Sequence, residues 1–230
     1  MHSEWITLET AHGFHCPAWQ ATPTGTPHAA VVILQEIFGV NPHIRAVTER
    51  FAARGYLAIA PALFARVQPE VELGYSPADL QTGVALKTAA EQLPGTGILA
   101  DIQAAIDHAA TRSGRKVGVV GFCWGGLMAW RAACELQGLS AAVSYYGGGI
   151  TTSAEIARQP RCPVLAHFAR QDQWIPMDGV QAFAAAHPEV QSHVYDAHHG
   201  FNCDQRASYD EAAAIAARNR TLAFFNHYLA

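Results

Sequence analysis

The sequence predicts an α/β fold in which a mostly parallel sheet carries helices on both faces. Apolar runs of strand length alternate with helical segments along nearly the whole chain, which is typical of this class. Several of these runs are continuously apolar, as expected of parallel strands buried on both faces. No internal repeat, low-complexity tract or long polar linker divides the chain, so we expect residues 1–230 to form one domain.

The first third of the chain contains four expected strands. Two short ones, 4–9 and 14–20, lie on either side of a His-Gly pair. The third, 28–36, reads "HAAVVILQE" and is almost entirely apolar, which favours a parallel strand covered on both faces. The fourth is the short run "YLAIAP" at 56–61.

Two helices are expected in the same region. The first covers 42–54, because Pro42 suits a first helical turn and the segment ends in a basic turn followed by glycine. The second covers about 77–92, within a longer excursion over 62–96, with Ser76 as its N-cap and a Pro-Gly pair after it. Such a long excursion could cover a functional site.

The rest of the chain alternates regularly. A helix is expected over 98–112, because its apolar residues recur at positions i, i+4, i+7, i+8 and i+11. The remaining expected strands are 116–122, 140–146, 162–169 and 190–197, and the remaining helices are 124–137, 176–187 and 208–228. In sheets of this kind ligands bind at the carboxyl ends of the strands, so functional residues are sought there.

Composition excludes several classes of function. The formal net charge is -4 and the 15 basic residues are scattered, so we expect no nucleic-acid or anionic-membrane partner. No apolar stretch is long enough to span a bilayer, and the acidic N-terminus does not resemble a signal sequence, which predicts a cytoplasmic protein. The five cysteines are widely spaced, so neither a disulfide framework nor a zinc site is indicated, and no metal is expected.

One turn carries the strongest chemical signal. Residues 117–130, "VGVVGFCWGGLMAW", run from an expected strand into an expected helix, and "GFCWG" has the spacing of the G-x-S-x-G nucleophile elbow with cysteine at its centre. Small residues at Gly121 and Gly125 would leave room for the tight turn. Cys123 would then stand at a helix N-terminus, where the dipole favours a thiolate. Short glycine turns after strands also occur without catalysis, so the turn alone leaves both interpretations open.

Two further residues follow in the order that a triad requires. Asp172 comes directly after the strand at 162–169, and His199 comes after the strand at 190–197, with His198 beside it. Each could be an ordinary loop residue, but three placements at strand ends agree with the order nucleophile, acid, base. We therefore predict that Cys123, Asp172 and His199 form a catalytic triad.

At this point the sequence resembles the dienelactone hydrolase family of the α/β-hydrolase fold, along nearly its whole length. The motifs that carry the resemblance are "QEIFGVNPHIR" (35–45), "GYLAIAPALF" (55–64), "GVVGFCWGG" (118–126), Asp172 with Pro176, and "HHGF" (198–201). The resemblance implies a cofactor-free hydrolase of small esters or lactones that acts through a thiol ester intermediate.

The resemblance also implies roles for individual residues. Cys123 would be the nucleophile, His199 the general base and acid, and Asp172 the group that orients the imidazole. Glu36 would interact with the thiol and help to activate it when substrate binds. The backbone N–H groups of Ile37 and Trp124 would form the oxyanion hole.

Substrate recognition departs from the family pattern. Family members hold the substrate carboxylate with two arginines, one of them in the excursion after the fourth strand, where this chain has no arginine and only Lys87. Arg206 could be the second, although a surface ion pair is an equal alternative for it. Further aromatic candidates for the pocket, each with core packing as its alternative, are Phe38, Trp124, Tyr145, Trp174 and Phe201.

Three other functions remain as alternatives. The missing arginine keeps open a broad carboxylesterase or thioesterase that acts on another small metabolite. A dinucleotide-binding turn at 117–126 is disfavoured, because its glycines do not fit G-x-G-x-x-G. A third alternative is a non-catalytic relative that only binds a ligand, in the pocket where its relatives carry out catalysis. The intact triad disfavours it. We expect a monomer or small homo-oligomer whose partner is a small-molecule ester or lactone, with no cofactor.

Overall fold

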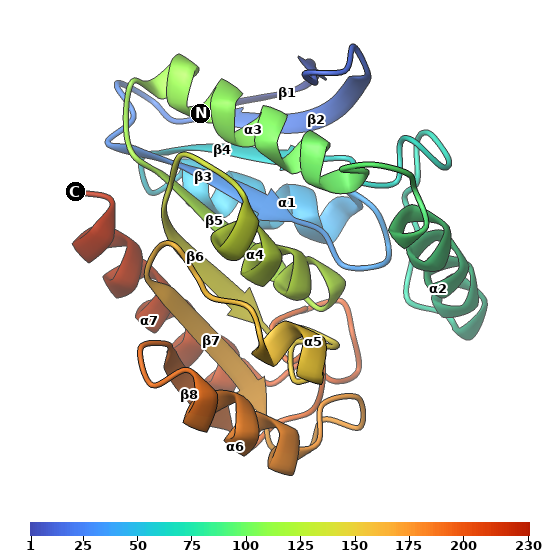
Figure 1. The fold of residues 1–230 in the computed structure, drawn as a ribbon. Helices are drawn as coiled ribbons and strands as arrows, with labels where there is room; N and C mark the ends of the chain where they lie inside the picture. Colours follow the sequence, from blue (N-terminus) through green and yellow to red (C-terminus); the bar gives the residue numbers. More distant parts are fainter.

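In the computed structural model, which describes residues 1–230, eight strands form one sheet in the order β1-β2-β4-β3-β5-β6-β7-β8 (Figure 1). The strands are β1 (His2–Glu9), β2 (His15–Thr22), β3 (Ala29–Leu34), β4 (Tyr56–Pro61), β5 (Val117–Phe122), β6 (Leu139–Tyr145), β7 (Val164–Ala169) and β8 (Gln191–Tyr195). The β1–β2 and β2–β4 pairs are antiparallel, and all other pairs are parallel. The mostly parallel sheet confirms the predicted fold class.

Seven helices accompany the sheet. They are α1 (Pro42–Ala52), α2 (Pro77–Glu91), α3 (Ile98–Ser113), α4 (Trp124–Glu135), α5 (Ser153–Ile156), α6 (Met177–Ala186) and α7 (Glu211–Tyr228). Helices α1 and α7 share one face, where the rings of Phe51 and Phe225 lie 6.1 Å apart. Helices α4 and α6 share the other face, where Trp130 packs edge-on against Phe183 at 5.1 Å. The sheet is thus covered on both sides, as predicted.

The central strands are buried because they are apolar on both faces. Every residue of β3, β4, β5 and β7 is buried. Burying a side chain such as Ile33 or Leu34 stabilises the fold by about 1.5–3 kcal/mol. This packed core holds the carboxyl ends of the strands, and the loops that follow them, in fixed relative positions.

The predicted elements are all present, with ends that differ by a few residues. The expected strand at 28–36 stops at Leu34, so Glu36 lies in the loop beyond the sheet. The last helix begins at Glu211, because the Asp210 side chain accepts a hydrogen bond from the Ala213 N–H and caps it. The single-turn helix α5 was not predicted, since four residues are too few to show a helical period.

Helix α2 stands apart from the sheet, beyond the carboxyl ends of the strands (Figure 1). Its N-terminus has the predicted Ser76 cap, in a capping box with Asp79. Gly83 brings its backbone close to the loop after β3, since a Cβ there would lie only 2.3 Å from the Ile37 carbonyl oxygen. The excursion is therefore anchored beside the end of β3. No helix has the length and apolar character that a membrane span needs.

Candidate active site

The turn between β5 and α4 has the conformation of a nucleophile elbow. Cys123 has φ 54° and ψ -119°, a conformation that non-glycine residues rarely adopt and that costs about 1–3 kcal/mol. A Cβ at Gly121 would lie 1.9 Å from the Gly125 carbonyl oxygen, and one at Gly125 would lie 2.3 Å from that of Leu34. Both glycines are therefore required by the close approach of neighbouring backbone, which explains the spacing seen in the sequence.

The elbow directs the Cys123 thiol toward the positive end of a helix. Helix α4 begins at the next residue, Trp124, so its first N–H groups have no acceptor within the helix. Those groups and the helix dipole favour a negative charge on the sulfur or on an adjacent oxygen. Cys123 is half-buried and lines a pocket, so its sulfur is accessible to a small molecule.

Asp172 and His199 meet at the carboxyl ends of β7 and β8. The His199 Nδ1 and the Asp172 Oδ2 lie 2.7 Å apart, and both residues are almost completely buried. The other carboxylate oxygen, Asp172 Oδ1, accepts hydrogen bonds from the Trp174 and Ile175 N–H groups at 2.8 and 3.2 Å. The backbone therefore holds the carboxylate, and the carboxylate orients the imidazole.

The electrostatic environment of His199 favours its protonated form. Burial opposes the charge, but the Cys123 sulfur and the Asp172 carboxylate outweigh burial and raise the pKa of His199 above its usual value. The neighbouring His198 points elsewhere, since its exposed ring donates from Nδ1 to the Gln171 carbonyl oxygen at 3.2 Å. Of the two histidines, the structure places His199 beside Cys123 and Asp172.

A buried ion pair adjoins the elbow. Glu36 is buried just past β3, and its Oε1 accepts a hydrogen bond from Arg206 Nη1 at 3.1 Å. The Arg206 guanidinium also lies over the rings of Phe38 and Tyr75, at 5.7 and 5.8 Å from their centres. A Cβ at Gly200 would lie 2.5 Å from Arg206 Nη1, so this glycine makes room for the arginine. Arg206 therefore pairs with a buried carboxylate, and the surface ion pair considered from the sequence is not present.

Cys123 and His199 line a pocket of about 370 Å³. Its lining residues are Ile37, Phe38, Leu80, Val84, Lys87, Cys123, Trp124, Gly148, Gly149, Trp174, His199 and Arg206. The pocket thus unites the expected nucleophile and base, the two expected oxyanion-hole residues and the expected substrate contacts Arg206, Phe38 and Trp174. Trp124 is fixed by stacking on Phe64 at 5.1 Å and by an indole hydrogen bond to Glu91 Oε1 at 3.1 Å.

Another expected substrate contact, Phe201, lies elsewhere. Its ring is completely buried and packs against Tyr146 and Tyr195, at 5.1 and 5.2 Å. Gly200, with φ 83°, turns the chain inward immediately after His199, and this turn carries the ring into the core. The expectation that Phe201 lines the pocket is corrected accordingly. Tyr145 is also a core residue, with its hydroxyl 2.7 Å from that of Thr221.

The excursion supplies three pocket residues, of which the sequence drew attention only to Lys87. Leu80, Val84 and Lys87 all face the pocket from α2, at positions i, i+4 and i+7. That spacing is the signal that could have revealed them, because residues so spaced share one face of a helix. The excursion therefore does cover the site, and Lys87 brings a second cation near Arg206 into the pocket.

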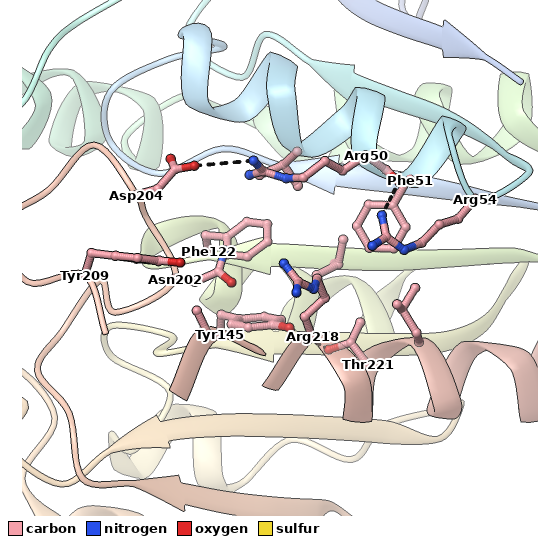
Figure 2. A pocket seen from close by; sticks show the side chains of 14 residues that line it. Arg50, Phe51, Arg54, Phe122, Tyr145, Asn202, Asp204, Tyr209, Arg218 and Thr221 are labelled. Atoms are coloured by element: carbon pink, nitrogen blue, oxygen red, sulfur yellow. Dashed lines mark hydrogen bonds and ion pairs between the residues drawn. The ribbon is translucent and has the colours of Figure 1, made fainter. Parts of the chain in front are cut away.

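A second hollow lies between α1 and α7 and is a weaker candidate (Figure 2). Its volume is only about 70 Å³, and it is surrounded by Arg50, Arg54 and Arg218. Asp204, at one end, accepts from Arg50 at 3.5 Å. None of the triad residues reaches this hollow. It can hold little more than a small anion or water, so the site of chemistry is the larger pocket.

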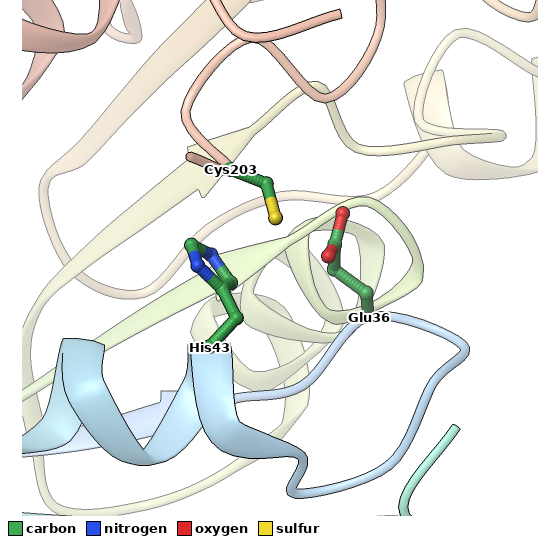
Figure 3. Close-up of side chains that lie close together, drawn as sticks. All are labelled: Glu36, His43 and Cys203. Atoms are coloured by element: carbon green, nitrogen blue, oxygen red, sulfur yellow. The ribbon is translucent and has the colours of Figure 1, made fainter. Parts of the chain in front are cut away.

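One buried cluster has the composition of a metal site. Glu36, His43 and Cys203 each offer one ligand atom, and these atoms lie within 4.8 Å of one another (Figure 3). The cluster was not expected, because its residues come from three separate segments and form no spacing motif.

Comparison with known proteins identifies the family. The model of the dienelactone hydrolase family matches residues 16–229. A Synechocystis sp. protein that is provisionally named a carboxymethylenebutenolidase is 38% identical over 86% of this chain and 85% of its own length. The carboxymethylenebutenolidase of Pseudomonas putida is 33% identical over 97% of this chain and 96% of its own.

A solved structure gives the same result for the fold. It is that of a Klebsiella pneumoniae protein described provisionally as a dienelactone hydrolase, with a TM-score of 0.83 and 33% identity over 99% of each chain. The names of these relatives, carboxymethylenebutenolidase and dienelactone hydrolase, are those of enzymes that hydrolyse a lactone. The chain therefore belongs to the dienelactone hydrolase family and is an ester hydrolase of the α/β-hydrolase fold.

Proposed function

We propose that this protein hydrolyses a dienelactone, a small unsaturated lactone that bears a carboxylate, through a thiol ester on Cys123. The observation that carries the proposal is the arrangement of Cys123 on its elbow beside His199, which Asp172 holds at 2.7 Å. A relative named for the same reaction, the Pseudomonas putida carboxymethylenebutenolidase, supports the substrate class.

In the first half-reaction the Cys123 sulfur attacks the lactone carbonyl carbon. The negative charge that develops on the carbonyl oxygen is stabilised by the N–H groups of Trp124 and Ile37. As the tetrahedral intermediate collapses, a carbon–sulfur bond remains, the ring carbon–oxygen bond breaks, and the departing enolate takes a proton from His199. An enolate is a good leaving group, so a thiolate can displace it without the stronger activation that cleavage of an amide needs.

In the second half-reaction water cleaves the thiol ester. His199, now neutral, removes a proton from water while the resulting hydroxide attacks the same carbonyl carbon. The carbon–sulfur bond breaks, and Cys123 leaves as a thiolate beside the protonated imidazole. The raised pKa of His199 supports this pair, because it favours the imidazolium next to the sulfur.

Glu36 links substrate binding to activation of the thiol. Without substrate its Oε1 is paired with Arg206, while its Oε2 is buried without a hydrogen-bond partner. A substrate carboxylate that pairs with Arg206 would compete for the same guanidinium and free Glu36. Glu36, released from the guanidinium, can then accept the Cys123 proton, and it returns this proton to the thiolate once the product has left and Arg206 pairs with Glu36 again.

The charge of the pocket supports a carboxylate-bearing substrate. Two cations, Arg206 and Lys87, line the pocket, and no carboxylate lines it. Lys87 stands in the excursion, where the family pattern predicts an arginine, and it lies 4.0 Å from Glu91. A carboxylate held between the two cations would leave the lactone ring near Cys123.

The apolar rim of the pocket supports a second candidate, a broader esterase. Leu80, Val84 and Trp174 are 40%, 49% and 61% exposed and all line the pocket. Exposed apolar side chains around a cleft are typical of a surface that receives an apolar group. A neutral ester with an aromatic or acyl group would use this rim and not the two cations.

Turnover of a dienelactone and of a p-nitrophenyl ester by the purified protein tests both candidates, with Cys123→Ala as control. Dienelactone turnover that disappears in the variant supports the proposal. Ester turnover alone, again lost in the variant, supports the broader esterase and the same nucleophile. Activity that survives in the variant would exclude Cys123 as the nucleophile.

A further inference from the structure

The cluster of Glu36, His43 and Cys203 lies behind the pocket, on the far side of the Glu36–Arg206 pair. All three side chains are buried, with exposed fractions of 1%, 0% and 0%. Figure 3 shows them pointing toward one common space, from the loop after β3, from α1 and from the loop that follows His199. Polar side chains at this depth normally have hydrogen-bond partners.

Two of the ligand atoms have no partner. Glu36 Oε2 and His43 Nε2 are both buried without a hydrogen bond. Leaving a buried polar atom unpaired destabilises the fold, so two such atoms that face one space indicate a missing occupant. An occupant that binds an oxygen, a nitrogen and a sulfur atom together would give both unpaired atoms a partner.

His43 is oriented as a metal ligand. Its Nδ1 lies 3.3 Å from Asp204 Oδ1, and an Nδ1–H that donates to this carboxylate leaves the Nε2 lone pair directed into the cluster. A histidine that is held by a carboxylate through one nitrogen and binds a metal through the other is the common arrangement in zinc sites. Burial also lowers the pKa of His43, so the ring is neutral and able to ligate.

We propose that Glu36 Oε2, His43 Nε2 and Cys203 Sγ form a binding site for Zn²⁺, while Glu36 Oε1 remains the acceptor for Arg206. The mixture of imidazole, thiolate and carboxylate suits zinc, with a fourth position left for water. In tetrahedral zinc sites the ligand atoms lie roughly 3.5 Å apart, so the present separations of up to 4.8 Å need only small side-chain rotations.

Charge and proton balance follow from the ligands. A cysteine thiol is largely protonated at neutral pH, so the Cys203 sulfur carries a proton that the metal must displace. Binding therefore releases one proton to solvent, and the carboxylate and thiolate together neutralise the two charges of Zn²⁺. Arg206 closes the cluster on the pocket side, and its movement away from Glu36 would open a route for the ion.

The site would regulate the reaction proposed above, and this consequence rests on the proposed role of Glu36. A carboxylate bound to Zn²⁺ cannot accept the Cys123 proton, so bound zinc should slow the formation of the thiol ester. Metal binding itself does not depend on that role and is measured separately.

The binding test uses the full-length Cys123→Ala protein, which removes the catalytic thiol as a competing ligand. Calorimetric titration with Zn²⁺ in two buffers of different ionisation enthalpy gives the stoichiometry and the number of protons released, and titration with Co²⁺ gives a thiolate-to-cobalt absorption band. We expect one Zn²⁺, one released proton and the cobalt band.

Second substitutions in the same protein identify the ligands. Cys203→Ser should abolish the cobalt band, and His43→Asn should weaken zinc binding by about 100-fold or more, whereas Cys134→Ser, which alters another buried thiol, should change nothing. Asp204→Asn, at a half-exposed side chain that leaves the core intact, should weaken binding by about 10–100-fold.

Two results would overturn the site. One is the absence of zinc binding and of the cobalt band in the Cys123→Ala protein. The other is zinc binding that is unchanged by Cys203→Ser, His43→Asn and Asp204→Asn. Zinc inhibition of the wild-type enzyme that Cys203→Ser relieves would support the regulatory consequence. A cobalt band without such inhibition would keep the site and reject the role of Glu36.

Discussion

The two sides of the pocket are built differently. The side with Cys123, Asp172 and His199 rests on strand ends, and the helix behind it, α4, has ten of its twelve residues buried. The side that faces them rests on α2, a helix of fifteen residues with only three buried, Gly83, Leu86 and Ala90. The triad side is therefore part of the core, whereas the substrate side is a cover attached at a few points.

This difference separates the residues that carry out the reaction from the residues that select the substrate. Groups that transfer protons must be held within a fraction of an ångström, and burial in a packed core provides that precision. Groups that select a substrate can lie on an exposed element, where substitutions change the surface of the pocket at little cost to stability. Substitutions on the triad side should therefore affect turnover, and those on the α2 side should affect substrate preference.

The largest effect is expected from Cys123→Ala. Without the sulfur no thiol ester can form, and kcat should fall by about 10⁴-fold or more, as when other enzymes lose their nucleophile. The control is Cys162→Ala, which removes another half-buried thiol that lies outside the pocket and should retain full activity. Steady-state kinetics on one activated ester compares the two variants, and equal activities would contradict the assignment.

Asp172→Asn should lower kcat/KM by about 10²–10⁴-fold, because the imidazole loses its orienting acceptor. The carboxylate helps to raise the pKa of His199, so its removal should also lower that pKa. The imidazolium beside Cys123 would then be lost at a lower pH as the pH rises. The pH profile of Cys123 alkylation should show this shift, and the exposed control Asp178→Asn should not.

Glu36→Gln should lower kcat/KM by about 10–100-fold on a carboxylate-bearing lactone, since an amide cannot accept the thiol proton. The Arg206 side chain should remain in place, because the amide oxygen can still accept its hydrogen bond. Full activity in this variant would show that the mechanism does not need Glu36, and it would leave the assignment of the triad unchanged.

Gly83→Ala tests how closely the cover is coupled to the catalytic side. The new Cβ would lie 2.3 Å from the Ile37 carbonyl oxygen, so α2 and the oxyanion loop must move apart. A displacement of about 1 Å near the reacting groups can reduce the rate by about 10²-fold, while the melting temperature should change little because α2 contributes only Leu86 and Ala90 to the core. The exposed neighbour Thr82→Ala is the control, and a large loss of stability would show that α2 contributes more to the stability of the fold than its few buried residues indicate.

The smallest effect is expected from Lys87→Ala. The loss of one half-exposed cation should raise KM for a carboxylate-bearing lactone by about 5-fold, which corresponds to about 1 kcal/mol, and leave kcat nearly unchanged. KM for a neutral p-nitrophenyl ester should not change. An equal increase for both substrates would mean that Lys87 acts through the shape of the pocket and not through its charge.

The same division explains what the sequence could predict. The positions of the three triad residues could be predicted, because each residue comes just after a strand. The apolar runs identify the strands, and the end of a strand determines where the next loop begins. These residues are Cys123, Asp172 and His199. The pairing of Glu36 with Arg206 could not be predicted from spacing, since the two residues are 170 positions apart and Arg206 lies in an irregular loop.

The incorrect prediction has a local cause. Phe201 comes two residues after His199, but the positive φ of Gly200 turns the chain and sends the ring into the core. The sequence identified Lys87 only as an isolated basic residue. Its place in the pocket could not be predicted, because no strand end lies next to it in the excursion. Residues on strand ends were thus predictable, whereas those on loops and on the cover were not.

The most direct test of the account is to trap the intermediate. The protein is quenched with acid during turnover of a slow ester, and intact mass followed by peptide mapping locates any covalent adduct. The account predicts one acyl group, on Cys123. The other four thiols should stay unmodified, because burial raises the pKa values of Cys16, Cys134, Cys162 and Cys203 to about 12, 12, 11 and 11. An adduct on any other residue, or turnover in which a slow ester leaves no adduct on Cys123, would contradict the thiol ester mechanism.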